Sequence, residues 1–270
     1  MPEVSVIMGV YNTPIKYIKK AIDSILNQTF QNFEFIICND CCTDDTFEYV
    51  KKTYSNNPKI IIIENDVNKG LAYTLNHCIR ISKGEYIARM DADDFSHENR
   101  FEKQIEFLKR NPKIDLVSCC CNVFDEDGIY GERIYRNNVN VRDFLFNQPI
   151  IHPAIMVRKT ALDIVNNYRD IKKTYRYEDY DLFLRMLIAG QKMYILPDKL
   201  FDFREDQNSL KRRAYKYRIN EYRVRYENFK KLGLLPKYYL YCVKPLIVGL
   251  IPNKVLNNFR NKCKEISKDD

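Results

Sequence analysis

Three carboxylates, those of Asp91, Asp93 and Asp94, lie within four residues directly after the largely apolar run at 85–90. Carboxylates this close together repel one another unless a cation sits among them. Hard divalent ions such as Mg²⁺ and Mn²⁺ prefer oxygen ligands and commonly bridge a carboxylate to a phosphate. The segment therefore predicts a metal–diphosphate site and a nucleotide-linked substrate, although Asp-rich turns also occur as plain solvated loops.

The elements that would position these carboxylates alternate between strands and helices. Short apolar runs typical of buried strands stand at 4–10, 33–38, 59–63 and 85–90. Helical patterns lie between them, at 14–26, about 44–53 and 71–81. This order predicts a parallel, doubly wound α/β sheet, in which ligands bind beyond the carboxyl ends of the strands. Polar residues follow three of these strands: Tyr11-Asn12, Asn39-Asp40 and Asp91–Asp94.

The second half of the chain has a less regular pattern. A helix is predicted at about 98–110 and another at 179–189, where Gly190 ends the apolar spacing. Strand-like runs are predicted at 114–124, 129–136, 154–157, 192–196 and 200–204. The chain shows no internal repeat and no low-complexity linker, so one catalytic body of about 210 residues is expected.

Charge divides the chain unevenly. Residues 211–270 hold 16 Lys and Arg against 5 Asp and Glu, a net charge of +11, whereas residues 1–210 carry −3. Nine cysteines include Cys41-Cys42 and Cys119-Cys120-Cys121, but no CxxC pair and no disulfide framework. This pattern, with no signal-peptide pattern at the N-terminus, predicts reduced thiols and a cytoplasmic protein.

The basic segment 211–270 has several possible partners. Arg, Lys and Tyr alternate over 209–231, and the apolar stretch 232–251 is interrupted by Lys237 and Lys244. Two glycines and two prolines in that stretch should weaken any continuous helix, so it is a poor membrane span. A basic amphipathic helical segment on an anionic membrane surface is favoured. A cap packed on the body or a homo-oligomer contact is the alternative, and nucleic acid is the least favoured partner.

Five motifs in order resemble the inverting family 2 glycosyltransferases, whose nucleotide-sugar-binding fold is called GT-A. The matching segments stand at 4–12, 39–46, 68–70, 84–94 and 178–182, and the resemblance covers roughly 3–210. It is closest to bacterial enzymes that build surface polysaccharides. The resemblance implies a GT-A catalytic domain at 1–210, followed by a helical C-terminal segment at 211–270.

The resemblance and the local chemistry together assign roles to residues. Asp93 and Asp91 would hold Mn²⁺ or Mg²⁺, and Asp179, with Glu178 beside it, would be the base that deprotonates the acceptor hydroxyl. The donor nucleotide is expected at Val10, Tyr11, Asn12, Asp40, Lys69, Gly70, Arg89 and Asp91. The donor sugar or the acceptor is expected at Asp94, His152 and Arg204.

Each assignment has a plainer alternative. Asn12 could serve only turn chemistry, Arg89 could pair with Asp91, and His152 could be a hydrogen-bonded core residue. Glu178 and Asp179 could simply complement the helix dipole. Asp181, on the same helix, is expected to be structural.

Two departures from the family pattern are visible. The family usually has Asp-Asp-Gly-Ser where this chain has Asn39-Asp40-Cys41-Cys42, and a turn glycine is therefore lost. Many relatives have an Arg followed two positions later by a His, where this chain has Arg204 and Asp206. The loop shape, the nucleotide preference and the third protein ligand of the metal are consequently left open.

The function expected is transfer of a sugar from a nucleoside-diphosphate donor to a hydroxyl of a lipid-linked or growing surface glycan, and the donor is expected to be UDP-linked. The enzyme would work on the inner face of the cell membrane as a peripheral protein. A nucleotidyltransferase is the alternative enzyme class, but Gly9-Val10-Tyr11-Asn12 is not a basic, glycine-rich phosphate loop. A non-enzymatic module that docks through its basic tail is the third possibility.

Overall fold

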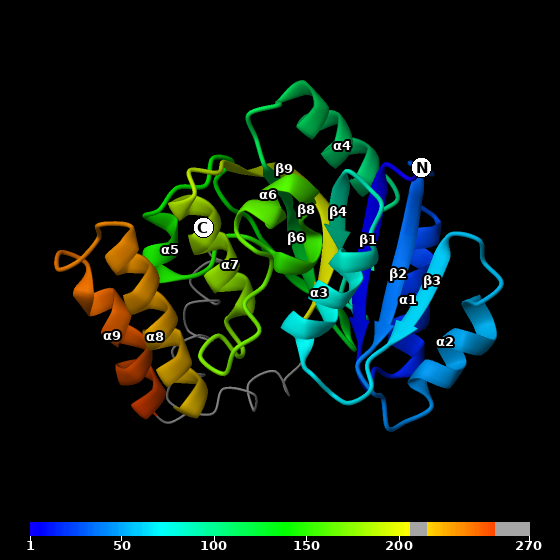
Figure 1. Ribbon diagram of the computed structural model, residues 1–270, viewed down its shortest axis with the longest axis horizontal. Helices are drawn as coiled ribbons and strands as arrows, with labels where there is room; N and C mark the ends of the chain where they lie inside the picture. The colour runs from blue at the N-terminus through cyan, green and yellow to red at the C-terminus, as the bar shows by residue number, and fades with distance from the viewer. Residues whose placement is uncertain (206–214, 252–270) are drawn as a thin grey trace.

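A mixed sheet flanked by helices forms the body of the protein in a computed structural model that describes residues 1–205 and 215–251 (Figure 1). The strands are β1 (Val4–Val10), β2 (Phe33–Asn39), β3 (Ile60–Glu64), β4 (Tyr86–Arg89), β5 (Phe95–Ser96), β6 (Leu116–Asp125), β7 (Gly128–Arg133), β8 (Met156–Arg158) and β9 (Met193–Arg204). The helices are α1 (Ile15–Leu26), α2 (Thr46–Tyr54), α3 (Leu71–Ile81), α4 (Arg100–Arg110), α5 (Asp143–Phe146), the 3-10 turn η1 (His152–Ala154), α6 (Lys159–Ile164), α7 (Glu178–Ile188), α8 (Tyr215–Lys231) and α9 (Tyr239–Leu250).

The strand order is β3-β2-β1-β4-β8-β6-β9-β5, with β7 paired to β6. Strands β1 to β4 are mutually parallel where they pair, as the alternation of apolar runs and helical patterns predicts. Beyond β4 the sheet is mixed, because β8 runs antiparallel to both of its neighbours whereas β6 and β9 are parallel. The carboxyl ends of β1, β2 and β4 therefore meet at one edge, where the acidic turn begins.

Helices cover both faces of this sheet. Val6 and Met8 belong to a core shared with α1, α2 and α4, whereas Ile7 belongs to the core that includes α3, α6 and α7. This alternation follows from the period of two along a strand. The acidic turn therefore follows a central strand of the sheet, β4, and α7 packs on one face of the same sheet.

Two predicted elements differ from the structure. The runs at 192–196 and 200–204 form one strand, β9, that crosses Pro197 and Asp198 without ending. Register shifts against β6 at Cys119 to Cys121 absorb the irregularity. The strand predicted at 154–157 is shorter, because η1 takes up residues 152–154 before β8 begins.

The C-terminal helices lie at the opposite end of the molecule from β3, beside α7 (Figure 1). Helix α8 buries Val224 and Phe229 in the core that includes α7, so packing on the body is what the structure shows for this helix. The expectation that glycine and proline weaken a continuous helix over 232–251 is confirmed at Gly233 and Pro236, which lie between α8 and α9, whereas α9 itself continues through Pro245 and Gly249. A Cβ atom on Gly249 would lie 2.9 Å from Arg218 Cγ, so glycine permits the close approach of α8 that stabilises α9.

Within the described residues, no helix is both long and apolar enough to cross a membrane. The eight cysteines there are all free, in line with the expected reduced thiols. Asp206 and the end of the basic segment, 252–270, lie outside the described residues.

Candidate active site

The acidic turn after β4 brings three carboxylates together. Ligand oxygens of Asp91, Asp93 and Asp94 all lie within 4.8 Å of one another. The side chains of Asp91 and Asp93 are 30% and 34% exposed, whereas the whole Asp94 residue is only 2% exposed. The turn therefore presents two carboxylates outward and holds one beneath them.

Two arginines offset part of this charge. Arg89, at the end of β4, is buried and its Nη2 pairs with Asp91 Oδ1. This is the ion pair considered as the alternative to a phosphate contact for Arg89. Arg204 Nε lies 3.2 Å from Asp93 Oδ2, and the backbone N–H of Arg204 donates to Asp94 Oδ1 at 2.7 Å. The end of β9 is thus fastened to the acidic turn through Arg204.

The environment of the buried Asp94 carboxylate disfavours its negative charge. Burial, followed by the charges of Asp91 and Asp93, raises the pKa of Asp94 well above its ordinary value. Its Oδ2 is buried and has no hydrogen-bond partner among the described residues. Burial likewise raises the pKa of Asp91, although Arg89 opposes that shift. An all-oxygen donor set with an unsatisfied buried oxygen fits a hard divalent cation such as Mg²⁺ or Mn²⁺, held through Asp91 and Asp93.

A second pair of carboxylates stands at the first turn of α7. Burial raises the pKa of Glu178 to about 7 and also raises the pKa of Asp179 above its ordinary value. Asp179 Oδ1 accepts its neighbour's backbone N–H at 2.7 Å, and Oδ2 accepts a hydrogen bond from Gln148 Nε2 at 2.9 Å. A carboxylate with a raised pKa, fixed by two hydrogen bonds, is suited to accept a proton near neutral pH.

His152 lies beside this pair as a buried, neutral imidazole. Its Nδ1 is 3.9 Å from Asp179 Oδ2, and its Nε2 is 2.7 Å from the Tyr168 hydroxyl. Burial, with a further contribution from Arg89, lowers the pKa of His152 well below its ordinary value. The histidine therefore adds no positive charge next to Asp179, and it combines core hydrogen bonding with a place at the site.

One cavity of about 320 Å³ connects the two acidic groups. Arg89 and Asp91 line it from the sheet edge, and Glu178, Asp179 and His152 line it from the opposite side. Residues separated by almost ninety positions in the sequence thus face the same space. A substrate placed there would contact the acidic turn and the carboxylates of α7 together.

The ends of β1 and β2 form a loop pair beside this cavity. Asn12 Oδ1 accepts the N–H of Thr43 at 2.9 Å, and Asn12 Nδ2 donates to Thr43 Oγ1 at 2.9 Å. The Asn12 side chain therefore ties the two loops together, while Tyr11 next to it is 49% exposed. Val10 is buried, and its carbonyl accepts the N–H of Asp40 at 2.8 Å. A base contact in this region remains a prediction.

Cys41 occupies the position at which the family usually has glycine. Its φ of 61° lies in the left-handed region, where an ordinary side chain is strained. The loop nevertheless closes, because Asn39 Oδ1 accepts the N–H of Cys42 at 2.8 Å. The turn therefore keeps the left-handed backbone conformation that glycine adopts without strain, although Cys41 stands there.

Asp40 is used inside the protein. Its Oδ1 accepts from the N–H of Lys69 at 2.8 Å and from Asn65 Nδ2 at 2.9 Å, and its Oδ2 accepts from the N–H of Gly70 at 2.9 Å. The backbone N–H groups of Lys69 and Gly70, two residues expected at the donor nucleotide, are therefore already bonded to a buried carboxylate. A carboxylate has about four acceptor positions, so one remains on Asp40 for a base imide.

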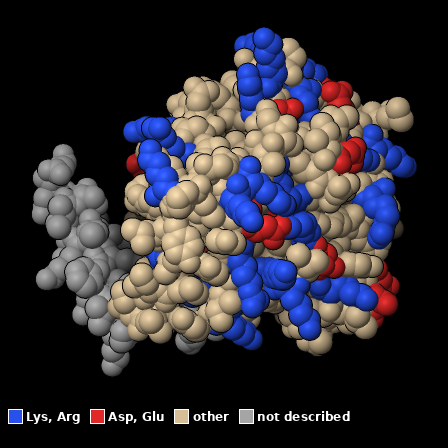
Figure 2. All heavy atoms as spheres, turned by 60° about the vertical axis from the view of Figure 1, so that its left-hand side comes forward, with Lys and Arg blue, Asp and Glu red and all other residues tan. Residues whose placement is uncertain are grey.

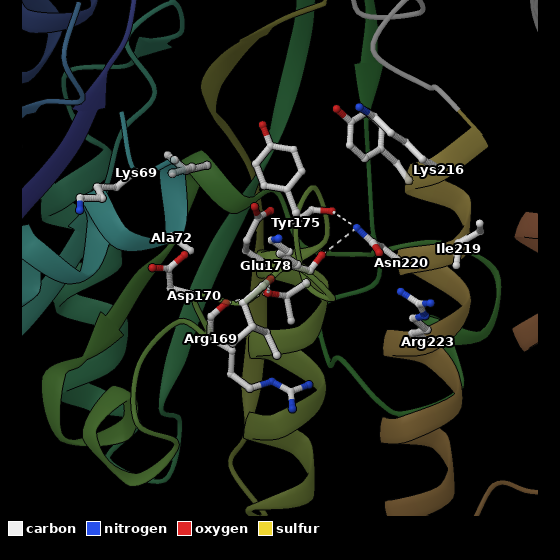
Figure 3. Close-up of a pocket in the computed structure, with 16 residues that line it drawn as sticks. Lys69, Ala72, Arg169, Asp170, Tyr175, Glu178, Lys216, Ile219, Asn220 and Arg223 are labelled. Carbon is white, nitrogen blue, oxygen red and sulfur yellow. Dashed lines mark hydrogen bonds between the residues drawn. The ribbon is translucent and has the colours of Figure 1, made fainter. Parts of the chain in front are cut away.

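A larger cavity of about 760 Å³ adjoins Glu178 on the side of α8 (Figure 3). Lys69, Gly70 and the start of α3 line one side, and Lys216, Asn220 and Arg223 of α8 line the other. Asn220 Nδ2 holds the intervening loop by donating to the carbonyls of Lys172 and Tyr175 at 3.0 and 3.2 Å. Two residues predicted to bind the donor thus line this cavity and not the one at Asp179.

Several residues at the central cavity were not predicted. Gln148, Arg133, Tyr135 and Arg176 line it, and Tyr168 supports His152 from behind. Gln148, Tyr168 and Arg176 stand in irregular connections and Arg133 ends β7, and no motif marks any of them. Their place in the cavity wall identifies them, together with the hydrogen bonds of Gln148 to Asp179 and of Tyr168 to His152.

Comparisons with known proteins agree with this architecture. The sequence model described as glycosyl transferase family 2 matches residues 5–179. EpsE of Bacillus subtilis, which is named as a glycosyltransferase, is 38% identical over 262 residues, covering 97% of this chain and 94% of EpsE.

Two solved structures share the fold at low sequence identity. Staphylococcus aureus TarS in complex with UDP-GlcNAc has a TM-score of 0.69 at 20% identity, covering 93% of this chain and 72% of TarS. The mannosyltransferase PcManGT of Pyrobaculum calidifontis, in complex with GDP-Man and Mn²⁺, has a TM-score of 0.64 at 18% identity, covering 97% of this chain and 80% of that one.

Proposed function

The chain belongs to glycosyl transferase family 2, and from that premise we propose that it is an inverting, metal-dependent enzyme that uses a UDP-sugar. The sugar would pass to a hydroxyl of a lipid-linked or growing surface glycan. The observation that carries the proposal is the cavity in which Asp91 of the acidic turn faces Asp179 of α7.

The chemistry assigned to this cavity is a single displacement. Asp179 accepts the proton of the acceptor hydroxyl, and the resulting oxygen attacks the anomeric carbon as the bond to the diphosphate oxygen breaks. Attack from the face opposite the leaving group inverts the anomeric configuration. A divalent cation held by Asp91 and Asp93 would supply Lewis-acid stabilisation of the leaving diphosphate.

The nucleotide assignment draws on the neighbours and on the loop pair at β1 and β2. TarS binds UDP-GlcNAc and PcManGT binds GDP-Man, so the base preference is the part of the proposal that most needs measurement. Asp40 offers one acceptor position to a ring N–H of the base, which uracil carries in its imide and guanine in its lactam. The proposed place of action is the cytoplasmic face of the membrane.

The test is a donor assay with UDP-, GDP- and TDP-sugars in the presence of Mn²⁺. We expect release of the free nucleoside diphosphate from UDP-sugars, and loss of that release in excess EDTA and in Asp93→Asn. Full activity in excess EDTA would refute metal dependence. Release of pyrophosphate in place of the nucleoside diphosphate would identify a nucleotidyltransferase.

A further inference from the structure

A cavity of about 490 Å³ adjoins Asp179 on the side of the C-terminal helices. It is a separate space from the central cavity, but Gln148, Arg176 and Asp179 line both. Its remaining walls come from the α5 end, α8 and α9, where Phe146, Arg218 and Lys244 contribute. A molecule held in it can therefore extend a group to the carboxylate assigned as the base.

The walls of this cavity are rich in cations. Arg176, Arg218, Arg225 and Lys244 line it, against the two carboxylates of Asp179 and Glu221. Glu221 already pairs with two of these cations, at 3.0 Å from Arg218 and 3.0 Å from Arg225.

The other two cations lack such a partner. No carboxylate of the described residues lies within ion-pair distance of Arg176 or Lys244. Lys244 Nζ donates only to the carbonyl of Phe146, at 3.1 Å. Burial, followed by the charge of Arg225, lowers the pKa of Lys244. Two cations that line one cavity, with no carboxylate partner among the described residues, fit an anionic ligand.

Part of the wall of the same cavity is apolar. Phe146, Pro245 and Val248 line it, and Phe146 is 57% exposed. On α9, Leu240 and Ile247 are 78% and 57% exposed and stand one turn before and after Lys244, so this cation lies between apolar side chains along the helix. Figure 2 turns this end of the molecule forward and shows more Lys and Arg than Asp and Glu on the visible surface. An apolar wall beside these cations fits an amphiphile with an anionic group.

We propose that this cavity binds the acceptor, and that the acceptor is a lipid-linked saccharide whose carrier is joined through a phosphate or diphosphate. The phosphate contacts Arg176 and Lys244, the apolar carrier passes over Phe146 and Ile247, and the sugar hydroxyl reaches Asp179. This inference rests on the proposed function. The larger cavity beside Glu178 is the weaker candidate, because Asp179 does not line it.

The binding test uses decyl phosphate as the probe, with decanol and inorganic phosphate as its two matched halves. Calorimetry is performed on the full chain saturated with UDP and Mg²⁺, so that the donor site is occupied. We expect decyl phosphate to bind more tightly than either half. Lys244→Gln and Arg176→Gln should each weaken it about tenfold, the effect of losing one hydrogen bond to a charged group. Arg223→Gln, in the larger cavity, is the matched control and should change nothing.

Each contrary result overturns a defined part of this inference. If decanol binds as tightly as decyl phosphate, the cavity makes an apolar contact without recognising phosphate. If inorganic phosphate binds as tightly as decyl phosphate, the apolar carrier contributes nothing to binding. Weakening by Arg223→Gln instead of Lys244→Gln moves the ligand to the other cavity.

A separate readout keeps the inference apart from the proposed function. Acceptor-independent hydrolysis of a UDP-sugar should be unchanged in Lys244→Gln, since that residue lies away from the acidic turn. No hydrolysis by the unmodified protein would contradict the proposed function, whereas unchanged decyl phosphate binding in both variants would contradict only the acceptor site. Retained UDP binding shows that the variants are folded.

Discussion

The two acidic groups that face the central cavity differ in their countercharges. The acidic turn has arginine partners, since Arg89 pairs with Asp91 and Arg204 lies 3.2 Å from Asp93. The pair Glu178 and Asp179 has none, because among the described residues the only basic group within 4 Å is His152, which burial keeps neutral. Two clusters of the same residue type are therefore prepared for different chemistry.

The difference indicates which cluster handles charge and which handles protons. Arginine beside Asp91 and Asp93 offsets part of their negative charge, which suits a cation site, although burial still raises the pKa of Asp91. Glu178 and Asp179 have amide donors as partners, and burial raises the pKa of both, which suits them to accept a proton. Asp181 provides a contrast one turn away on the same helix: it is fully buried between Arg169 and Arg185, and it accepts from Asn228 Nδ2 of α8 at 3.2 Å.

The largest expected effect comes from removing the proton acceptor. Asp179→Asn should lower kcat for sugar transfer by about 10²- to 10⁴-fold, the range for loss of a general base. Thermal unfolding should show no loss of stability, because Asn keeps the size of the side chain and removes a buried charge. If Asp179→Asn transfers sugar at the rate of the unmodified protein, Glu178 is the base instead.

Asp181→Asn should show the opposite pattern. Breaking a buried ion pair costs on the order of 3–5 kcal/mol, because Arg185 then lacks its carboxylate partner and Arg169 keeps only Glu227. Urea unfolding measures that loss, and the fraction that remains folded should keep most of its kcat. A variant that is stable but inactive would place Asp181 at the site and erase the contrast with Asp179.

Removing the amide that positions the base should have a smaller effect. Gln148→Ala deletes the 2.9 Å hydrogen bond that Gln148 Nε2 donates to Asp179 Oδ2. Because this hydrogen bond lowers the pKa of Asp179, its loss should raise that pKa. We expect about a tenfold loss of kcat and a shift of the acidic limb of the pH–rate profile to higher pH. A loss of rate with an unmoved pH profile would indicate a purely structural role for Gln148.

Glu178 should make stability depend on pH. Its folded-state pKa is about 7, above the ordinary 4.5, so the folded state holds a proton that the unfolded state releases. The contribution to stability is therefore present at low pH and is lost as the pH rises towards 7. Glu178→Gln removes this loss and should be more stable than the unmodified protein by about 2 kcal/mol at pH 8, with a smaller gain at pH 5. Urea unfolding at both pH values tests this, and an equal gain at both would contradict it.

The smallest expected effect lies in the loop at the end of β2. Cys41→Gly should stabilise the protein by about 1 kcal/mol or less, because glycine adopts a φ of 61° without strain but loses more entropy on folding. Cys42→Gly is the matched control and should destabilise, since Cys42 Sγ accepts the N–H of Asn12 at 3.3 Å. If both variants are destabilised alike, the loss of the Cys41 side chain costs more stability than the relief of its backbone strain restores.

The N-terminal half of the fold follows directly from local patterns. The predicted strand at 4–10 and helix at 71–81 have the same bounds in the structure, because the apolar pattern of each, and Gly70 before the helix, act within a few residues. The second half was less predictable. Strand β9 continues through Pro197 and Asp198, and α9 contains Pro245, because long-range pairing and packing on α8 outweigh local propensity.

The site likewise contains some residues that the sequence predicts and others that only the tertiary structure identifies. Asp91 and Asp179 were named from sequence, and the structure brings both to one cavity. The use of Asp40 as an internal acceptor for Lys69 and Gly70 was not predictable, because those hydrogen bonds join residues about thirty positions apart. Gln148 carried no signal at all in its own neighbourhood.

By itself, the sequence determined the types of chemical group available and the strand ends at which they stand, since both depend on residue identity and short-range period. The tertiary structure alone decided which carboxylates have an arginine beside them, and which are left to burial and amide donors. The physical reason is that a pKa responds to desolvation and to charges a few ångströms away. Such neighbours are set by the packing of β4, β9 and α7, and not by their order along the chain.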